Sequence, residues 1–219
     1  MDLAAVIFDL DGVLVDSEQL WDSARRELVA ERGGTWRDDA TRAMMGMSAP
    51  EWSRYVREQL GVDLEPGAIS DAVVERLARL YRERLPLLPG AREAVVAASQ
   101  RWPLGLASSS NREIIDLVLE RAQLTERFTA TVSSEEVARG KPAPDVYLEA
   151  ARRLGVAPTS SAAVEDSTNG LRAAVAAGMA VVAVPNETFP PSAAALGRAA
   201  AVVHSLDELV PALERLERA

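Results

Sequence analysis

The sequence contains no cysteine and a single histidine, His204, and these two shortages exclude several kinds of site. Without cysteine the chain forms neither a disulfide framework nor a metal site of thiolates. With one imidazole it forms no zinc site built on several histidines, and a histidine-dependent triad would have to use His204. Any metal site must therefore be built from oxygen ligands.

Basic residues are also in short supply: 24 Lys and Arg oppose 33 Asp and Glu, which gives a formal net charge of -9. This charge disfavours binding to nucleic acid and to anionic membranes. No run is apolar for long enough to cross a bilayer, and the first eleven residues lack the basic region of a signal peptide. We expect a cytoplasmic protein, a monomer or weak dimer, with neither nucleic acid nor membrane as a partner.

The 219 residues suffice for one large domain or for a core with a smaller module. A compact apolar run at 4–8 indicates a buried strand. After Gly90 the pattern alternates between strand and helix, which is typical of a parallel sheet with helices on both faces. The expected strands cover residues 4–8, 103–107, 129–132, 161–164, 180–184 and 200–204. The expected helices there cover residues 91–101, 111–122, 145–154 and 170–177.

Between these two parts the chain changes character. Residues 18–32, 50–60 and 70–84 have helical spacing and many charges, and no convincing strand interrupts them. We therefore predict an α/β fold: a doubly wound, Rossmann-like parallel sheet formed by residues 1–16 and 87–219. Residues 17–86 would form a helical cap domain inserted after the first strand, in a position suited to a lid.

Polar residues follow four of the expected strands or open the helices after them. Taken singly, each group has an ordinary explanation as a turn, a helix cap or a solvated charge. Because a parallel sheet brings its carboxyl ends to one edge, the four groups should converge in one crevice. The groups are Asp9-Leu10-Asp11-Gly12, Ser108-Ser109-Ser110-Asn111, Lys141-Pro142 and Glu165-Asp166-Ser167.

The chemistry of these side chains is mutually consistent. Asp9, Asp11 and Asp166 would repel one another without a cation, and oxygen ligands favour a hard ion such as Mg²⁺. The metal would keep Asp9 ionised for attack on phosphorus. Ser108 and the Lys141 ammonium would bind the phosphate oxygens. Asp11 would protonate the leaving oxygen and then deprotonate the attacking water.

The four groups resemble the motifs of the haloacid dehalogenase superfamily, in the same order along the chain. The first motif stands here as Asp9-Leu10-Asp11-Gly12-Val13-Leu14-Val15-Asp16-Ser17, the second has Ser108, the third has Lys141 and the fourth reads Val164-Glu165-Asp166-Ser167-Thr168-Asn169-Gly170. The helical insert resembles the small cap of the branch that holds β-phosphoglucomutase, sugar phosphatases and phosphoglycolate phosphatases.

The resemblance implies specific roles. Asp9 would be the nucleophile and Asp11 the acid and base. Mg²⁺ would bind Asp9, the backbone carbonyl of Asp11 and Asp166, with Glu165 also counted among its ligands or near it. A small-molecule phosphate ester would be the substrate, and a phosphorylated Asp9 the intermediate.

Two departures argue against a mutase. Trp21 stands where the mutase has a histidine that helps move the proton, and Ala49 stands where its cap loop has an arginine for a second phosphate. We therefore predict Mg²⁺-dependent hydrolysis of a small organic phosphomonoester, with a sugar phosphate as the expected substrate. A sugar-phosphate mutase is the alternative, and a non-enzymatic protein that is only phosphorylated on Asp9 is an alternative of another class.

Contacts to the rest of the substrate are harder to assign. Ser109, Asn111 and Gly46 are candidate substrate-binding residues. Glu18 and Trp21 lie where the chain enters the cap, and substrate contact or helix packing is equally expected of them. Three arginines of the cap, Arg25, Arg42 and Arg54, are expected on solvated helix faces, with contact to an acidic substrate as the lesser alternative.

Overall fold

The computed structural model describes residues 2–45, 47–186 and 188–218. Its centre is a six-stranded sheet of order β3-β2-β1-β4-β5-β6, in which every neighbouring pair is parallel. The doubly wound α/β fold expected from the sequence is thus confirmed. The strands are β1 (Ala5–Phe8), β2 (Leu104–Ser108), β3 (Ala130–Ser133), β4 (Ser161–Glu165), β5 (Ala180–Ala183) and β6 (Ala201–Val202).

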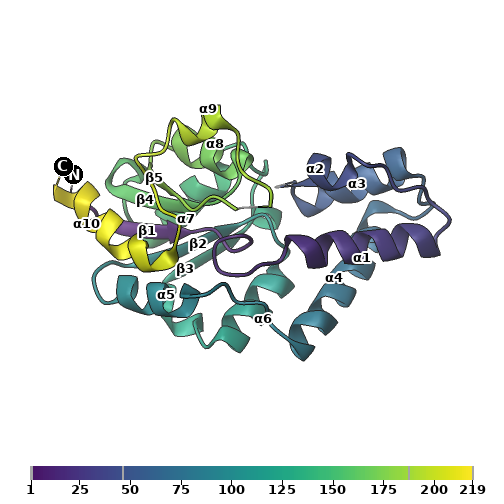
Figure 1. Ribbon diagram of the computed structural model, residues 1–219, viewed down its shortest axis with the longest axis horizontal. Coiled ribbons are helices and arrows are strands. Elements are labelled where there is room, and N and C mark those ends of the chain that lie inside the picture. Colours follow the sequence, from purple (N-terminus) through teal and green to yellow (C-terminus); the bar gives the residue numbers. More distant parts are fainter. Residues whose placement is uncertain (1, 46, 187, 219) are drawn as a thin grey trace.

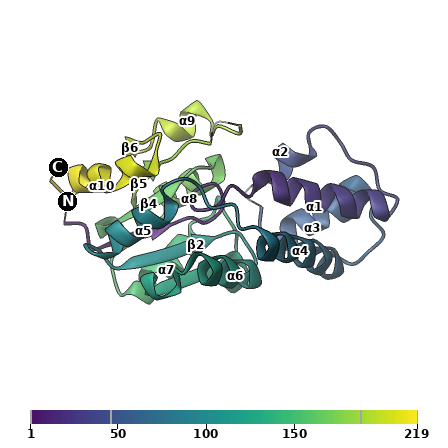
Figure 2. The ribbon, with the colours of Figure 1, turned by 60° about the horizontal axis from the view of Figure 1, so that its bottom comes forward.

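Helices cover both faces of this sheet, because successive side chains of a strand point to opposite sides. In β1, Val6 and Phe8 belong to an apolar cluster with α5, α6 and α10, whereas Ile7 belongs to a second cluster with α7 and α8. Figures 1 and 2 show the sheet between these layers. The helices are α5 (Ala91–Ser99), α6 (Arg112–Ala122), α7 (Asp145–Leu154), α8 (Thr168–Ala176) and α10 (Leu209–Arg218).

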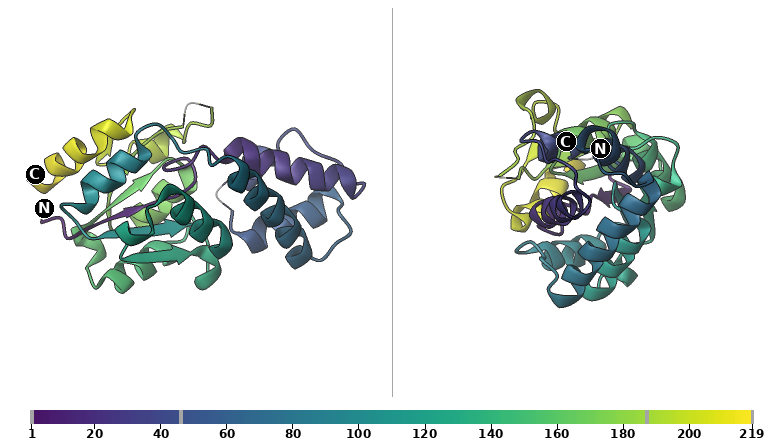
Figure 3. Two further views of the ribbon diagram at one scale, coloured as in Figure 1. Left: turned by 90° about the horizontal axis from the view of Figure 1, so that it is seen from below. Right: turned by 90° about the vertical axis from the view of Figure 1, so that its right-hand side faces the viewer.

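A group of helices lies beyond one end of the sheet, on the side away from the two chain termini (Figures 1 and 3). The described residues between β1 and α5 form no strand of the sheet. The cap boundaries drawn at residues 17 and 86 stay a prediction. The helices of this group are α1 (Glu18–Glu31), α2 (Ala40–Met44), α3 (Ala49–Leu60) and α4 (Pro66–Glu83).

Local sequence explains where α3 begins and ends. Ser48 and Glu51 form a capping box, in which each side chain pairs with the other residue's backbone N–H. Gly61 ends the helix with a φ of 77°, in the left-handed region that glycine adopts without strain. The start of α3 lies against the loop that carries Lys141, since a Cβ placed on Gly140 would be only 3.0 Å from the Ser48 Cβ.

The remaining elements are short. No helix in the described ranges is both long and apolar enough to cross a membrane. The periodicity of the sequence did not predict α2 or α10. The short elements are α9 (Ala193–Leu196) and the 3-10 turns Thr125–Arg127, Ser134–Glu136, Pro158–Ser160 and Leu206–Glu208.

Candidate active site

The strand order brings distant polar residues to one edge of the sheet. β1 lies between β2 and β4, so Asp9, which follows β1, is flanked by the ends of both neighbours. The Asp9 amide donates to the Val164 carbonyl at 2.9 Å, which continues the β1–β4 pairing past the end of the strand. The strands that follow β1 are placed first on one side of it, as β2 and β3, and then on the other, as β4 to β6. Open α/β sheets bind ligands where the strand order changes side in this way.

Lys141 is the cation of this edge. Its ammonium nitrogen lies 2.9 Å from Asp9 Oδ1 and 2.6 Å from Glu165 Oε1, and its side chain is only 2% exposed. Burial opposes the charge of the ammonium, but the carboxylates of Asp9 and Glu165 outweigh it and hold the pKa of Lys141 above its usual value. Lys141 is therefore charged at neutral pH and directed at Asp9.

Glu165 is fully occupied by protein donors. Its Oε1 accepts hydrogen bonds from the Lys141 ammonium and from the Tyr147 hydroxyl, the latter at 2.9 Å. Its Oε2 accepts from the amides of Asp166 and Ser167 and from the Ser167 hydroxyl, at 3.0, 3.1 and 3.2 Å. Gly170 leaves room for it, because a Cβ there would lie 1.7 Å from Oε1. This geometry suits Glu165 to anchor Lys141 more than to bind a ligand.

Three carboxylates could hold a metal ion at this edge. Asp9, Glu165 and Asp166 each offer an oxygen within 4.8 Å of the others, and all three are buried. Burial, and next the charge of Glu165, raise the pKa of both Asp9 and Asp166. No donor in the described part of the chain reaches the Asp166 carboxylate, although Asp166 is only 2% exposed. A buried cluster of carboxylates whose negative charge is only partly balanced by protein cations fits a hard divalent cation.

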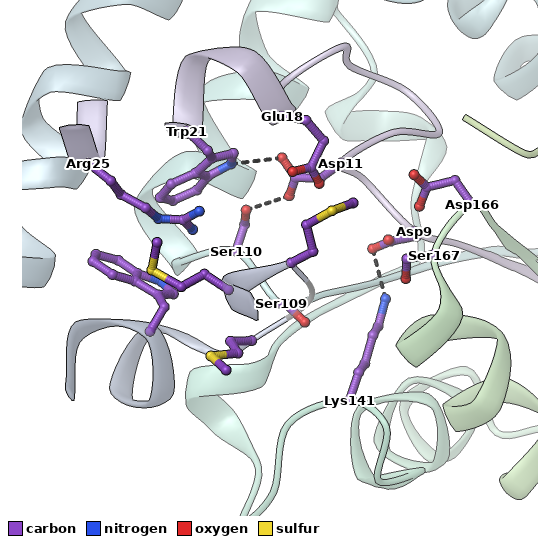
Figure 4. Close-up of a pocket in the computed structure, with 14 residues that line it drawn as sticks. Asp9, Asp11, Glu18, Trp21, Arg25, Ser109, Ser110, Lys141, Asp166 and Ser167 are labelled. Carbon is purple, nitrogen blue, oxygen red and sulfur yellow. Dashed lines mark hydrogen bonds and ion pairs between the residues drawn. The ribbon is translucent and has the colours of Figure 1, made fainter. Parts of the chain in front are cut away.

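Asp11 turns toward the cap. Its Oδ1 accepts hydrogen bonds from the Ser17 hydroxyl at 2.5 Å and from the Trp21 indole at 3.1 Å. Its Oδ2 accepts from the Ser110 hydroxyl at 2.5 Å. Figure 4 shows this carboxylate between Trp21 and Ser110, apart from Asp166. The Asp11 carboxylate is accordingly outside the acidic cluster, which leaves its backbone carbonyl as the metal contact implied by the resemblance.

A pocket lies between the sheet edge and the helices of the cap, and Asp9, Asp11, Lys141 and Asp166 line it (Figure 4). Three of the candidate substrate contacts, Glu18, Trp21 and Ser109, lie on its wall. The lining residues are Asp9, Asp11, Glu18, Trp21, Arg25, Met44, Met45, Met47, Trp52, Ser109, Ser110, Lys141, Asp166 and Ser167.

Three predicted site residues are not on that wall: Glu165, described above, Ser108 and Asn111. Ser108 is fully buried, and its hydroxyl accepts from the Ser110 amide at 3.0 Å. The Asn111 side-chain amide donates to Glu135 Oε1 at 2.7 Å and to the Ser70 hydroxyl of α4 at 3.3 Å, so it connects core and cap. Gly46 lies outside the described residues.

The expectation for Arg25 was wrong. Its side chain is not solvated: the residue is 7% exposed, and its guanidinium lies 4.9 Å from the ring centroids of both Trp21 and Trp52. Arg42 and Arg54 are exposed, as expected. Sequence reasoning failed for Arg25 because its burial depends on Trp52, which α3 brings from another part of the chain.

Other functional neighbours were also missed. The Ser110 contact to Asp11 and the Tyr147 contact to Glu165 each join residues at least 18 positions apart. Ser110 had a sufficient local explanation as a helix cap, and Tyr147 as a buried residue of an amphipathic helix. For Tyr147 a usable signal existed, since a buried tyrosine hydroxyl normally has a hydrogen-bond partner.

Comparisons with known proteins agree with this geometry. The family model for haloacid dehalogenase-like hydrolases matches residues 6–184. Hexitol phosphatase B of Escherichia coli is 37% identical over 189 residues, which cover 84% of each chain. A phosphorylated carbohydrates phosphatase of Thermotoga maritima is 36% identical over 179 residues, 81% of this chain and 82% of the relative. The crystal structure of CbbY from Rhodobacter sphaeroides in complex with phosphate superposes with a TM-score of 0.85 at 29% identity, covering 97% of this chain and 99% of that one. The chain therefore belongs to the haloacid dehalogenase-like hydrolase family.

Proposed function

We propose that the protein is a Mg²⁺-dependent phosphatase that hydrolyses a small sugar phosphate through a phosphorylated Asp9. The observation that carries this proposal is the buried Asp9 carboxylate, which lies 2.9 Å from the Lys141 ammonium and within a cluster of three acids. The names of the relatives support the substrate class, because two of them are phosphatases of hexitols and of phosphorylated carbohydrates.

In this mechanism Asp9 attacks phosphorus with one carboxylate oxygen, and the bond from phosphorus to the substrate alcohol breaks. Asp11 gives a proton to the departing oxygen, then takes one from the water that cleaves the phospho-aspartate. Lys141, oriented by Glu165, binds phosphoryl oxygens. Mg²⁺ held by Asp9, Asp166 and the Asp11 carbonyl would neutralise the phosphoryl oxygens and keep Asp9 ionised.

The surroundings of Asp11 favour hydrolysis over mutase chemistry. Trp21 stands where a mutase would use a histidine, and its indole N–H donates to Asp11 Oδ1 at 3.1 Å. An indole N–H donates a hydrogen bond but does not shuttle protons. Trp21 can therefore orient Asp11, whereas it cannot help return the phosphoryl group to a second sugar hydroxyl. Asp11 also argues against a long-lived phospho-aspartate switch, because a base beside the acyl phosphate promotes its hydrolysis.

The test is a phosphate-release screen over sugar phosphates, phosphoglycolate, nucleotides and pyridoxal phosphate, with Asp9→Asn as the control. We expect release that requires Mg²⁺, and a loss of at least about 10³-fold in kcat in the variant, as for removal of other nucleophiles. Release that persists in Asp9→Asn or in EDTA would contradict the mechanism. Conversion of β-glucose 1-phosphate without net phosphate release would indicate a mutase, and a stable phosphoenzyme would indicate a switch. The cytoplasmic location and the monomeric or weakly dimeric state stay predictions from the sequence.

A further inference from the structure

Arg25 is a buried cation whose hydrogen-bonding groups lack acceptors. Its guanidinium carbon lies over the rings of Trp21 and Trp52, 4.9 Å from each ring centroid. Such cation–π contacts stabilise the charge, but they supply no oxygen acceptor for the N–H groups. The buried Nε has no partner, and no acceptor in the described ranges binds the rest of the group.

Nearby acids offset the charge of Arg25 only in part. Burial lowers the pKa of Arg25 to about 10, and the carboxylates of Glu18, Asp11 and Asp22 act in the opposite direction. None of these acids forms an ion pair with Arg25, so they compensate its charge from a distance without accepting its hydrogen bonds. What the N–H groups lack is therefore an oxygen acceptor.

The helix α1 places Arg25 in the same pocket as the reacting groups. Glu18, Trp21 and Arg25 are spaced i, i+3 and i+7, so they share one face of α1, and all three line the pocket that also contains Asp9 and Lys141. Figure 4 shows this row running from Glu18, beside Asp11, to Arg25. The face thus presents a carboxyl acceptor and a guanidinium donor along the path away from the phosphoryl site.

We propose that Arg25 determines specificity by donating hydrogen bonds to hydroxyl or carbonyl oxygens on the uncharged tail of the substrate, with Glu18 accepting from a tail hydroxyl. This inference rests on the proposed phosphatase function and names the part of the substrate that the cap recognises. An acidic tail is disfavoured, because the Asp11 carboxylate and the ionised form of Glu18 line the same wall and would repel it. The two indoles hold the guanidinium in place before substrate binds, which reduces the entropy cost of forming these hydrogen bonds.

A matched pair of probes separates the two kinds of tail. Sorbitol 6-phosphate and 6-phosphogluconate share a six-carbon chain and differ only at C1, which carries a hydroxyl in one and a carboxylate in the other. Acetyl phosphate, which has no polyol tail, reports the phosphoryl chemistry alone. We would measure kcat and KM for all three with the wild type and with Arg25→Lys and Arg25→Met.

Arg26→Met is the control variant. Arg26 is the next residue of α1 and also lies over an indole, 4.5 Å from the Trp36 ring centroid, but it pairs with Asp22 on an exposed face. Arg25→Lys keeps the charge and loses the planar fork of donors, so it also answers the case in which Arg25→Met fails to fold. Tryptophan fluorescence of Asp9→Asn, with and without Arg25→Lys, gives the affinity for sorbitol 6-phosphate independently of turnover.

We expect the wild type to prefer sorbitol 6-phosphate. Both Arg25 variants should lose about 10-fold or more in kcat/KM for sorbitol 6-phosphate, chiefly through KM. Their kcat/KM for acetyl phosphate should change by less than about threefold. Arg26→Met should leave kcat/KM unchanged for both probes. A wild-type preference for 6-phosphogluconate that disappears in Arg25→Met would overturn the proposal in favour of an acidic tail. Equal losses on all three probes, no loss, or wild-type turnover of acetyl phosphate alone would also overturn it. Failure of the phosphatase function itself is distinguishable, because it removes the Asp9-dependent release from acetyl phosphate.

Discussion

Replacing Tyr147 by Phe tests whether Glu165 is held by donated hydrogen bonds. The Tyr147 hydroxyl is fully buried and donates to Glu165 Oε1 at 2.9 Å. Burial, and next the charge of Glu165, raise the pKa of this phenol, so it remains a donor at neutral pH. The variant keeps the ring, over which the Lys141 ammonium lies at 5.0 Å, and removes only the hydroxyl. One buried hydrogen bond to a carboxylate is therefore lost without a large change in packing.

The size of the effect follows from that loss. A hydrogen bond to a charged group contributes about 1.5–3 kcal/mol to the free energy of unfolding. For a protein of this length each kcal/mol shifts the melting temperature by about 2–4 °C, so Tyr147→Phe should lower Tm by about 3–12 °C. Differential scanning calorimetry at neutral pH measures the shift.

Tyr81 provides the matched control. It is as deeply buried as Tyr147. Its hydroxyl lies near Ser17, but the geometry between them is not that of a hydrogen bond. Tyr81→Phe should therefore leave Tm within about 2 °C of the wild type, or raise it, because no good hydrogen bond is lost. Equal shifts in the two variants would refute the reasoning, since they would show that loss of the hydroxyl and not loss of its partner determines the cost.

Two further changes test the metal site and the pH dependence. Gly12→Ala should raise the Mg²⁺ concentration for half-maximal activity by about 10-fold or more, because the new Cβ would lie 1.9 Å from Asp166 Oδ2. Gly61 is the control, because it has the same φ of 77° but a Cβ there would meet no atom within 4 Å, so Gly61→Ala should leave that concentration unchanged. A similar rise in both variants would contradict the placing of Asp166 in the metal site. Burial, and next the charge of Asp11, raise the pKa of Glu18 to about 7 from 4.5, so the folded state loses stability as pH rises through this interval. Glu18→Gln should reduce the fall in Tm between pH 4.5 and 7 in EDTA; an unchanged pH profile would exclude Glu18 as its source.

The core of the site could be predicted because its residues stand beside strands. In a parallel sheet, the residue after a strand has a known place at the carboxyl edge, whatever the sequence distance to its neighbours. Asp9 and Glu165 meet in this way, and Lys141 reaches them from the loop between β3 and α7, although 24 or more residues separate the three along the chain. Every strand bound agrees with the expectation within two residues, although the strand expected at 200–204 is shortened at both ends to Ala201–Val202, at the sheet edge.

The sequence did not indicate contacts that depend on a partner from another element. Asn111, at the end of the second motif, stays a predicted substrate contact, and its amide donates to Ser70 of α4 and to Glu135. Its neighbour Ser110, which seemed sufficiently explained as a helix cap, donates instead to Asp11. One residue of difference at the start of a helix decides which side chain reaches the pocket, and local propensity does not resolve that difference.

The adjacent arginines of α1 show why substrate recognition is harder to infer than chemistry. Arg25 and Arg26 are identical residues in the same helix, and each lies over an indole ring. Because one residue turns the helix by about 100°, Arg26 faces the surface and pairs with Asp22, whereas Arg25 faces the pocket and lies over the Trp52 ring. Charge and propensity cannot separate the two, and helix position separates them only once α3 packs against the Arg25 face. In this fold the reacting groups follow from the strand ends, whereas the contacts to the rest of the substrate follow from how the cap helices pack.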